Sequence, residues 1–80
     1  MKLPRDISGQ ALAKKLSRYG YEITRQTGSH IRLTTIEKGE HHITIPDHNE
    51  LKVGTLSGII TDVAQHLQLT KEIIIRDLFR

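Results

Sequence analysis

Cysteine and tryptophan are absent from this chain of 80 residues, and its aromatic residues are two tyrosines and one phenylalanine. Without cysteine there can be no disulfide framework and no zinc site built on thiolates. So few aromatic rings (Tyr19, Tyr21 and Phe79) argue against a platform on which nucleic-acid bases stack. No apolar run approaches the ~20 residues of a membrane-spanning helix, and the opening "MKLPRDISG" lacks the apolar stretch of a signal peptide. We therefore expect a soluble, cytoplasmic protein without a membrane partner.

The residues that are present suffice for one small folded domain, which we place at residues 1–80. Hydrophobic residues make up 36% of the sequence, and with the glycines added the apolar share is ordinary for a globular domain. The formal net charge is +3 and the pI is about 9.5. This mild basicity permits a polyanionic partner such as nucleic acid but does not single one out.

Helical periodicity predicts three helices. The first lies in "ISGQALAKKLSRYGYE", between an N-cap at Ser8 and a left-handed residue at Gly20. Its buried stripe is expected to consist of Leu12, Ala13, Leu16 and Tyr19. The second lies in "TLSGIITDVAQHLQL", with Thr55 as its N-cap, and the third in "KEIIIRDLF", capped by Thr70. The stretch "PDHNELKVG" before the second helix is expected to be a loop.

Three runs rich in β-branched residues, "YEITRQ", "HIRLTTI" and "HHITIP", predict an antiparallel meander with glycine-containing turns. Alternation assigns one face of the sheet to packing against helices: Tyr21, Ile23, Ile31, Leu33, Ile43 and Ile45. The opposite face is expected to be polar and open to water or a ligand: Glu22, Thr24, Gln26, His30, Arg32, Thr34, His42 and Thr44. The predicted fold is therefore α+β, in two layers and in the order α-β-β-β-α(-α), with a three-stranded antiparallel sheet covered by helices on one face.

His30 is the first candidate for chemistry, because it follows a glycine turn at the start of the second strand. A neutral imidazole accepts a proton and its cation returns one. RNA offers a target, since its deprotonated 2′-hydroxyl attacks the neighbouring phosphorus without any metal. Arg32 shares the face of His30 and would offset developing negative charge, while Arg25 and Lys52 are further cations whose positions the pattern leaves open. The alternative is an exposed histidine without a role.

Other sites receive less support from the spacing. Ser29 and His30 are neighbours on a strand and point to opposite faces, which argues against a nucleophile and its base. The five histidines show no metal-binding spacing, although a site made by His42, His48 and Asp47 stays open, and His66 is expected to be solvated. No glycine pattern of a nucleotide-binding loop occurs.

The basic face of the first helix, with Lys14, Lys15 and Arg18, has two interpretations. Such a face is usually just solvated. Here it would also suit contacts with the phosphates of a nucleic acid, each of which adds salt dependence to binding.

The chain resembles the HicA (YcfA-like) family of bacterial toxin mRNA interferases over nearly its whole length. The similar segments are "SGQALAKKLSRYGYE", the Gly-Ser-His of "TGSHIRL", and "ITIPDHNELKVGTLSGII". The resemblance implies a fold like the double-stranded RNA-binding domain, with His30 as the catalytic residue. It also implies mRNA as the substrate and a HicB-type antitoxin that covers the active site. The chain departs from the family pattern at Thr27, where many members have a second glycine, and at Ser57 and Gly58, where basic residues are common.

We therefore expect a metal-independent endoribonuclease toxin that needs no cofactor. His30 would act as general base or acid, Arg32 as an electrostatic aid, and Lys14, Lys15 and Lys52 as contacts to the RNA backbone. The group that would assist His30 is not identifiable from the sequence. A non-catalytic RNA-binding module and a pure interaction subunit are the two alternatives.

Overall fold

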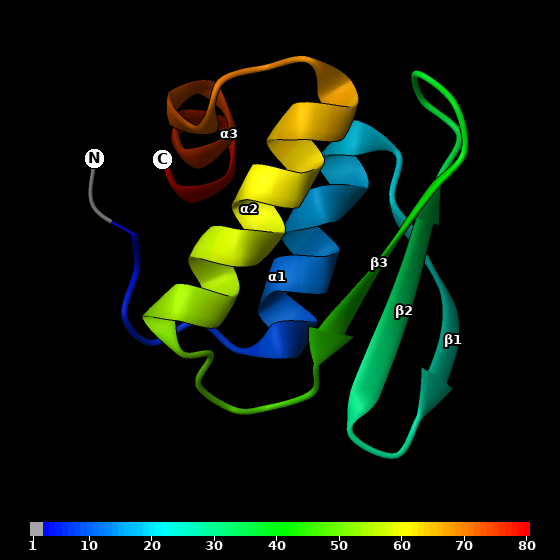
Figure 1. Ribbon diagram of the computed structural model, residues 1–80. Helices are drawn as coiled ribbons and strands as arrows, with labels where there is room; N and C mark the ends of the chain where they lie inside the picture. Colours follow the sequence, from blue (N-terminus) through cyan, green and yellow to red (C-terminus); the bar gives the residue numbers. More distant parts are fainter. Residues whose placement is uncertain (1–2) are drawn as a thin grey trace.

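Residues 3–80 are described by a computed structural model, in which one helix precedes a three-stranded sheet and two helices follow it (Figure 1). The elements are α1 (Gly9–Leu16), the short 3₁₀ turn η1 (Ser17–Tyr19), β1 (Glu22–Thr27), β2 (His30–Thr35), β3 (His41–Pro46), α2 (Val53–Leu67) and α3 (Lys71–Phe79). The strands are antiparallel in the order β1-β2-β3. The predicted α+β fold class and element order are thus confirmed.

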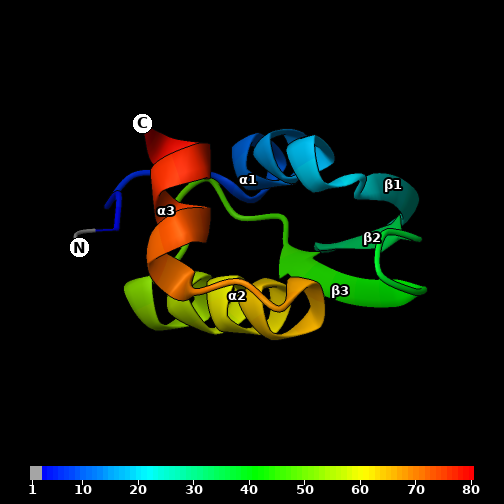
Figure 2. The same cartoon turned by 90° about the horizontal axis from the view of Figure 1, so that it is seen from above.

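The helices lie on one side of the sheet. Figure 2 shows α1 and α2 side by side against the strands, with α3 across the far side of that pair. The opposite face of the sheet is left uncovered by any element within residues 3–80. None of the helices in this part of the chain is long and apolar enough to cross a membrane.

The hydrophobic core fills the space between the sheet and the α1–α2 pair. Ile31, Leu33 and Ile45 reach into it from the strands, and Leu12 reaches into it from α1; all four are fully buried. Each such side chain contributes about 1.5–3 kcal/mol on leaving water. Tyr19, predicted to belong to the same stripe as Leu12, is only partly buried, because it lies in the tighter turn η1 beyond the end of α1. The alternation in β2 and β3 follows the prediction.

The predicted caps of the first and third helices are present. Ser8 Oγ accepts a hydrogen bond from the Ala11 backbone N–H at 3.0 Å, and Thr70 Oγ1 accepts one from the Ile73 N–H at 3.2 Å. Gly20 takes φ of 80° after η1, a conformation that glycine adopts without a steric penalty. These local signals end α1 and its extension where the chain must turn into the sheet.

The predicted cap of the second helix is wrong. The helix α2 begins at Val53, and its N-cap position is Lys52, which makes no side-chain capping bond. The carbonyl of Lys52 accepts the Leu56 N–H at 2.9 Å, so the helical ladder starts before Thr55 and leaves that residue in the first turn. The helix therefore starts where its backbone hydrogen bonds begin, at Lys52, although Thr55 has the side chain typical of an N-cap.

A β-bulge interrupts β1 at Thr24. Ile23 is paired with Leu33, but the next pair is Arg25 with Arg32, so one extra residue is accommodated in β1. A bulge of this kind lets two consecutive residues oppose a single one on the partner strand, and it re-aims the side chains that follow. Simple alternation therefore fails beyond this point of β1.

One face assignment in β1 is consequently wrong. Gln26 lies opposite Ile31 and so faces the helix side, whereas Arg25 and Thr27 join the uncovered face. Ile23 keeps its predicted side, but 49% of its surface is exposed. It lies on an edge strand, all six residues of which are exposed.

Candidate nucleic-acid interface

The uncovered side of the sheet, which we call the open face, is organised in three rows that run across the strands. Residues directly opposite each other on paired strands point to the same side. The first row is Thr27, His30 and Pro46; the middle row is Arg25, Arg32 and Thr44; the third row is Glu22, Thr34 and His42. Positive charge therefore lies in the middle row, next to His30, and acidic charge lies in the third.

His30 lies at one end of the open face, on the central strand, between the backbones of β1 and β3. It begins β2 directly after the turn of Gly28 and Ser29, where Gly28 takes φ of 54°. Its neighbours across the strands are Thr27 and Pro46. The carbonyl of Ser29 accepts the Asp47 N–H at 2.7 Å, which ties the turn to the chain that leaves β3. The ring is exposed, so a phosphodiester can approach it from solvent.

The two arginines of the middle row lie closest to His30 among the cations of the open face. Arg32 is two residues along β2, a separation of roughly 6.8 Å, and Arg25 lies directly across from Arg32. Both are exposed. The prediction that Arg32 shares the face of His30 is confirmed by the register, and the bulge adds Arg25, whose position the pattern of residues left open.

The predicted RNA-contacting lysines are distributed over two sides of the molecule. Lys52 precedes α2 and is exposed; Figure 1 shows this end of α2 at the same end of the molecule as the turn before β2. Lys14 and Lys15 belong to α1, which covers the other face of the sheet. The structure thus brings Lys52 toward the end of the sheet that holds His30 but does not bring the two lysines of α1 to the open face.

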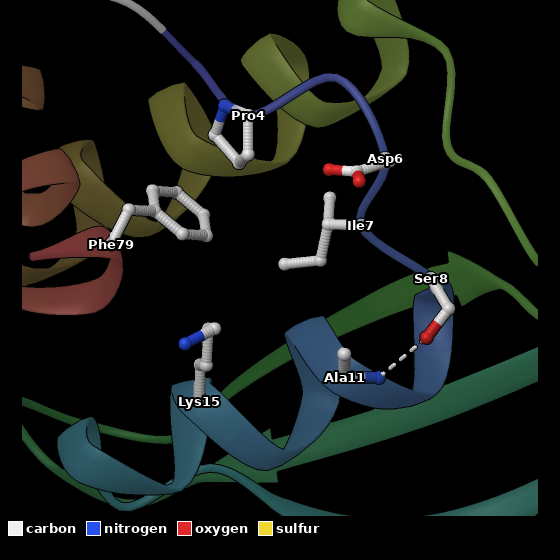
Figure 3. A pocket seen from close by; sticks show the side chains of 7 residues that line it. All are labelled: Pro4, Asp6, Ile7, Ser8, Ala11, Lys15 and Phe79. Carbon is white, nitrogen blue, oxygen red and sulfur yellow. Dashed lines mark hydrogen bonds between the residues drawn. The ribbon is translucent and has the colours of Figure 1, made fainter.

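Lys15 lines a pocket of about 390 Å³ between the N-terminal segment, α1 and α3 (Figure 3). Its Nζ lies 5.9 Å from the centroid of the Phe79 ring, in a cation–π contact. The remaining lining residues are Pro4, Asp6, Ile7, Ser8 and Ala11. This pocket lies on the side of α1 that faces away from the strands, so it is separate from the open face.

A family model described as the HicA toxin of bacterial toxin-antitoxin matches residues 9–65, which span α1, the whole sheet and most of α2. The chain belongs to the HicA toxin family. This confirms the resemblance stated above, and it makes the chain a toxin of a toxin–antitoxin pair with an antitoxin as its partner. No curated protein and no solved structure matches the chain. All three rows of the open face lie within the HicA match, whereas α3 lies outside it.

A hydrogen-bonded chain occupies the far end of the open face in this HicA-family domain. Thr24 Oγ1 is 2.9 Å from Thr34 Oγ1, which is 2.8 Å from His42 Nδ1, and His42 Nε2 is 2.8 Å from Glu40 Oε2. His42 lies across from Thr34, four residues along β2 from His30, or roughly 13 Å away. A general acid or base must come within hydrogen-bond reach of its proton, so His42 does not assist His30 at the same phosphodiester bond.

A second histidine network lies on the helix side, where sequence reasoning did not expect one. His41 Nδ1 is 2.8 Å from the hydroxyl of buried Tyr21, and its Nε2 is 3.2 Å from Asp62. Burial, with the charges of Asp62 and Glu37 in addition, raises the pKa of Tyr21 to about 12. The Asp62 carboxylate can only accept, so His41 Nε2 donates to it; in the tautomer that carries its proton on Nε2, Nδ1 accepts the hydroxyl of Tyr21.

The prediction that His66 is merely solvated is wrong. Its ring is half-buried and stacks on His41 with centroids 4.2 Å apart, and its Nε2 bonds the carbonyls of Glu37 and Gly39 at 2.8 and 3.0 Å. It thus fastens the β2–β3 hairpin loop to α2. Only the long-range packing of α2 on this loop brings the two rings together, so no spacing in the sequence signals the contact.

No metal-binding cluster of three or more ligating side chains is formed within residues 3–80. The site left open for His42, His48 and Asp47 therefore receives no support from the structure. His42 and Asp47 lie at opposite ends of β3, because the strand runs from His41 to Pro46.

Proposed function

We propose that this member of the HicA toxin family is a cytoplasmic endoribonuclease that cleaves mRNA without a metal ion, using His30 as general acid or base. The observation that supports the proposal most is the exposed imidazole at the start of β2, one row from two arginines. Its ring lies where an RNA strand crossing the open face would pass.

The reaction uses the 2′-hydroxyl that distinguishes RNA from DNA. Neutral His30 takes the proton of this hydroxyl while its oxygen attacks the adjacent phosphorus. The bond from phosphorus to the 5′-oxygen breaks, and that oxygen takes up a proton from water, while His30 later returns its own proton to solvent. The products are a 2′,3′-cyclic phosphate and a free 5′-hydroxyl. Arg32, one row away, acts as an electrostatic aid that offsets the negative charge of the RNA strand beside the reacting phosphorus.

The RNA backbone would be held by cations around this centre. Arg32 lies on the face of the sheet that carries His30, and Lys52 lies near the same end of the sheet as His30. Lys14 and Lys15 contact phosphates of a longer RNA that passes around the edge of the domain, because α1 is on the opposite side of the sheet. Such contacts position the strand but do not read its sequence.

The partner is proposed to be a HicB-type antitoxin that covers the open face. An inhibitor seated there would exclude RNA from His30 and neutralise the arginine row. The open face suits this role, since no element within residues 3–80 covers it.

The decisive experiment is cleavage of RNA in EDTA by wild type, His30→Ala and the matched control His42→Ala. Loss of an acid–base residue lowers the rate by about 10²–10⁴-fold, so we expect this loss for His30→Ala. The control keeps its activity, because its imidazole lies on the same face but away from the reaction. Circular dichroism establishes that each variant is folded.

Retained cleavage in folded His30→Ala contradicts the catalytic proposal. Wild-type protein that shifts RNA on a gel without cutting it would be a binding module. No RNA affinity even at low salt would instead indicate a pure interaction subunit, because backbone contacts are strongest under that condition.

A further inference from the structure

The bulge in β1 changes which side chain lies beside Arg32. In a regular strand continuing from Ile23, Thr24 would oppose Arg32 and Arg25 would point toward the helices. With the extra residue at Thr24, Arg25 is itself the cross-strand partner of Arg32. Bulges are frequent next to functional sites, where they re-aim a side chain. In this protein the bulge gives the middle row of the open face two guanidinium groups.

The two arginines are a like-charged pair without an acidic partner. Residues directly opposite on antiparallel strands have Cβ atoms about 4.5–5.5 Å apart, and like charges at this distance destabilise the sheet. Within residues 3–80 the close contacts between basic and acidic side chains are His41–Asp62, His42–Glu40 and Arg76–Asp77, so none involves Arg25 or Arg32. The third member of their row, Thr44, is neutral. A bound anion from outside the protein would therefore relieve the repulsion between the two arginines.

We propose that Arg25 and Arg32 together bind one phosphate of the RNA strand, the one next to the phosphate that the 2′-oxygen attacks beside His30; this rests on the function proposed above. The middle row lies roughly 6.8 Å from the row of His30, so a strand that places one phosphate at His30 brings a neighbouring phosphate over the two arginines. Two planar guanidinium forks match the oxygens of a single phosphate. The site holds the strand in position relative to His30 and contributes no base preference.

A phosphate site of this kind does not need a 2′-hydroxyl, and this allows binding to be measured apart from cleavage. The probe is a short, fully 2′-O-methylated RNA, which cannot be cut by 2′-hydroxyl attack. Its affinity is measured by fluorescence anisotropy across a range of salt concentrations. The proteins are wild type, Arg25→Gln, Arg32→Gln, the double variant, and the matched control Arg5→Gln, which removes an exposed arginine from the N-terminal segment on the helix side.

We expect each single variant in the middle row to bind about tenfold more weakly, as for a lost charge-assisted hydrogen bond. Because both side chains hold the same phosphate, the double variant should lose much less than the product of the two single effects. Its salt slope should fall by about 0.7, the value for one phosphate contact on a single strand. Arg5→Gln should bind like wild type.

Three results would overturn the inference. If Arg25→Gln binds as tightly as Arg5→Gln, Arg25 is not part of the site. If the salt slope of the double variant falls by about 1.4, the two arginines of wild type contact two separate phosphates. A clear drop in the melting temperature of Arg25→Gln at low salt contradicts an unrelieved repulsion.

The two proposals fail in different ways. Wild-type protein with no affinity for the probe refutes the proposed function and the phosphate site with it. Binding that depends on Arg25, in a protein that does not cut RNA, refutes only the catalytic role of His30. Cleavage that depends on His30 while Arg25 is without effect refutes only the phosphate site.

Discussion

Two of the glycines that lie in helices, Gly9 and Gly58, have opposite surroundings. Gly9 is the buried first residue of α1; its N–H donates to the His48 carbonyl at 2.9 Å, and a Cβ added there would overlap the backbone carbonyl of Pro46. Gly58 lies exposed in the middle of α2, where a Cβ would meet nothing. Pro46 is the cross-strand neighbour of His30. The missing side chain of Gly9 therefore lets α1 close against the end of the sheet that carries His30.

The two glycines make a matched pair of alanine substitutions with opposite expected signs. Gly9→Ala should destabilise the domain by about 1–3 kcal/mol, because a rigid backbone must shift to admit the methyl group. Gly58→Ala should stabilise it by up to ~1 kcal/mol, the difference in helix propensity. Urea unfolding of both variants measures the two values. Equal effects would contradict the close approach of Gly9 to Pro46.

At the scale of elements, α3 is attached to the rest of the domain by a polar tie as well as by its apolar side chains. Tyr19 donates its hydroxyl to Asp77 Oδ2 at 2.7 Å, and Arg18 Nη1 donates to the Asp77 carbonyl at 3.1 Å. The hydrogen bond from Tyr19, with the nearby charges of Arg76 and Arg18, lowers the pKa of Asp77 below its usual value of 3.8. Burial and the same bond to Asp77 raise the pKa of Tyr19 to about 12.

Because of the lowered pKa of Asp77, the attachment of α3 should contribute less to the stability of the fold at acidic pH. A carboxyl with a lowered pKa in the folded state stabilises that state above its ordinary pKa of 3.8, and the contribution is lost as the pH falls through the lowered value. We therefore expect the melting temperature of wild type to fall more steeply below pH 3.8 than that of Tyr19→Phe. Parallel curves for the two proteins would show that the tie contributes nothing.

Asp77→Asn serves as the second arm of this measurement. It removes the titrating group itself, so its curve should be as shallow as that of Tyr19→Phe in the same acidic range. Thermal melts followed by circular dichroism across this range measure all three proteins.

At the scale of the whole molecule, the two sides of the sheet differ in structure and in proposed role. One side is covered by α1, α2 and, beyond them, α3, and it carries the core and the histidine network around His41. The other side is polar and uncovered, and it carries His30 with the two arginines. Basic side chains are thus spread over both sides, and only some of them lie near the proposed reaction.

This separation predicts a ranking of lysine variants. On a short RNA, Lys52→Gln should reduce cleavage more than Lys15→Gln. Lys52 lies at the end of the molecule that holds His30, whereas the Lys15 side chain contacts Phe79 on the side of α1 that faces away from the sheet. Cleavage rates at low and moderate salt measure the ranking, and the difference should narrow as salt screens both contacts. The reverse order would contradict the proposed path of the RNA.

Local features of the sequence determined the element order, the caps at Ser8 and Thr70, the core of β2 and β3, and the placement of His30 with Arg32, because these depend on alternation, capping and turn chemistry within a few residues. The HicA motifs likewise identified the family correctly. Only the tertiary structure decided the bulge at Thr24 and the position of Arg25, since a bulge depends on which residues of the partner strand are available for pairing. The contact of His66 with His41 also needed the folded chain, because it joins residues that packing alone brings together.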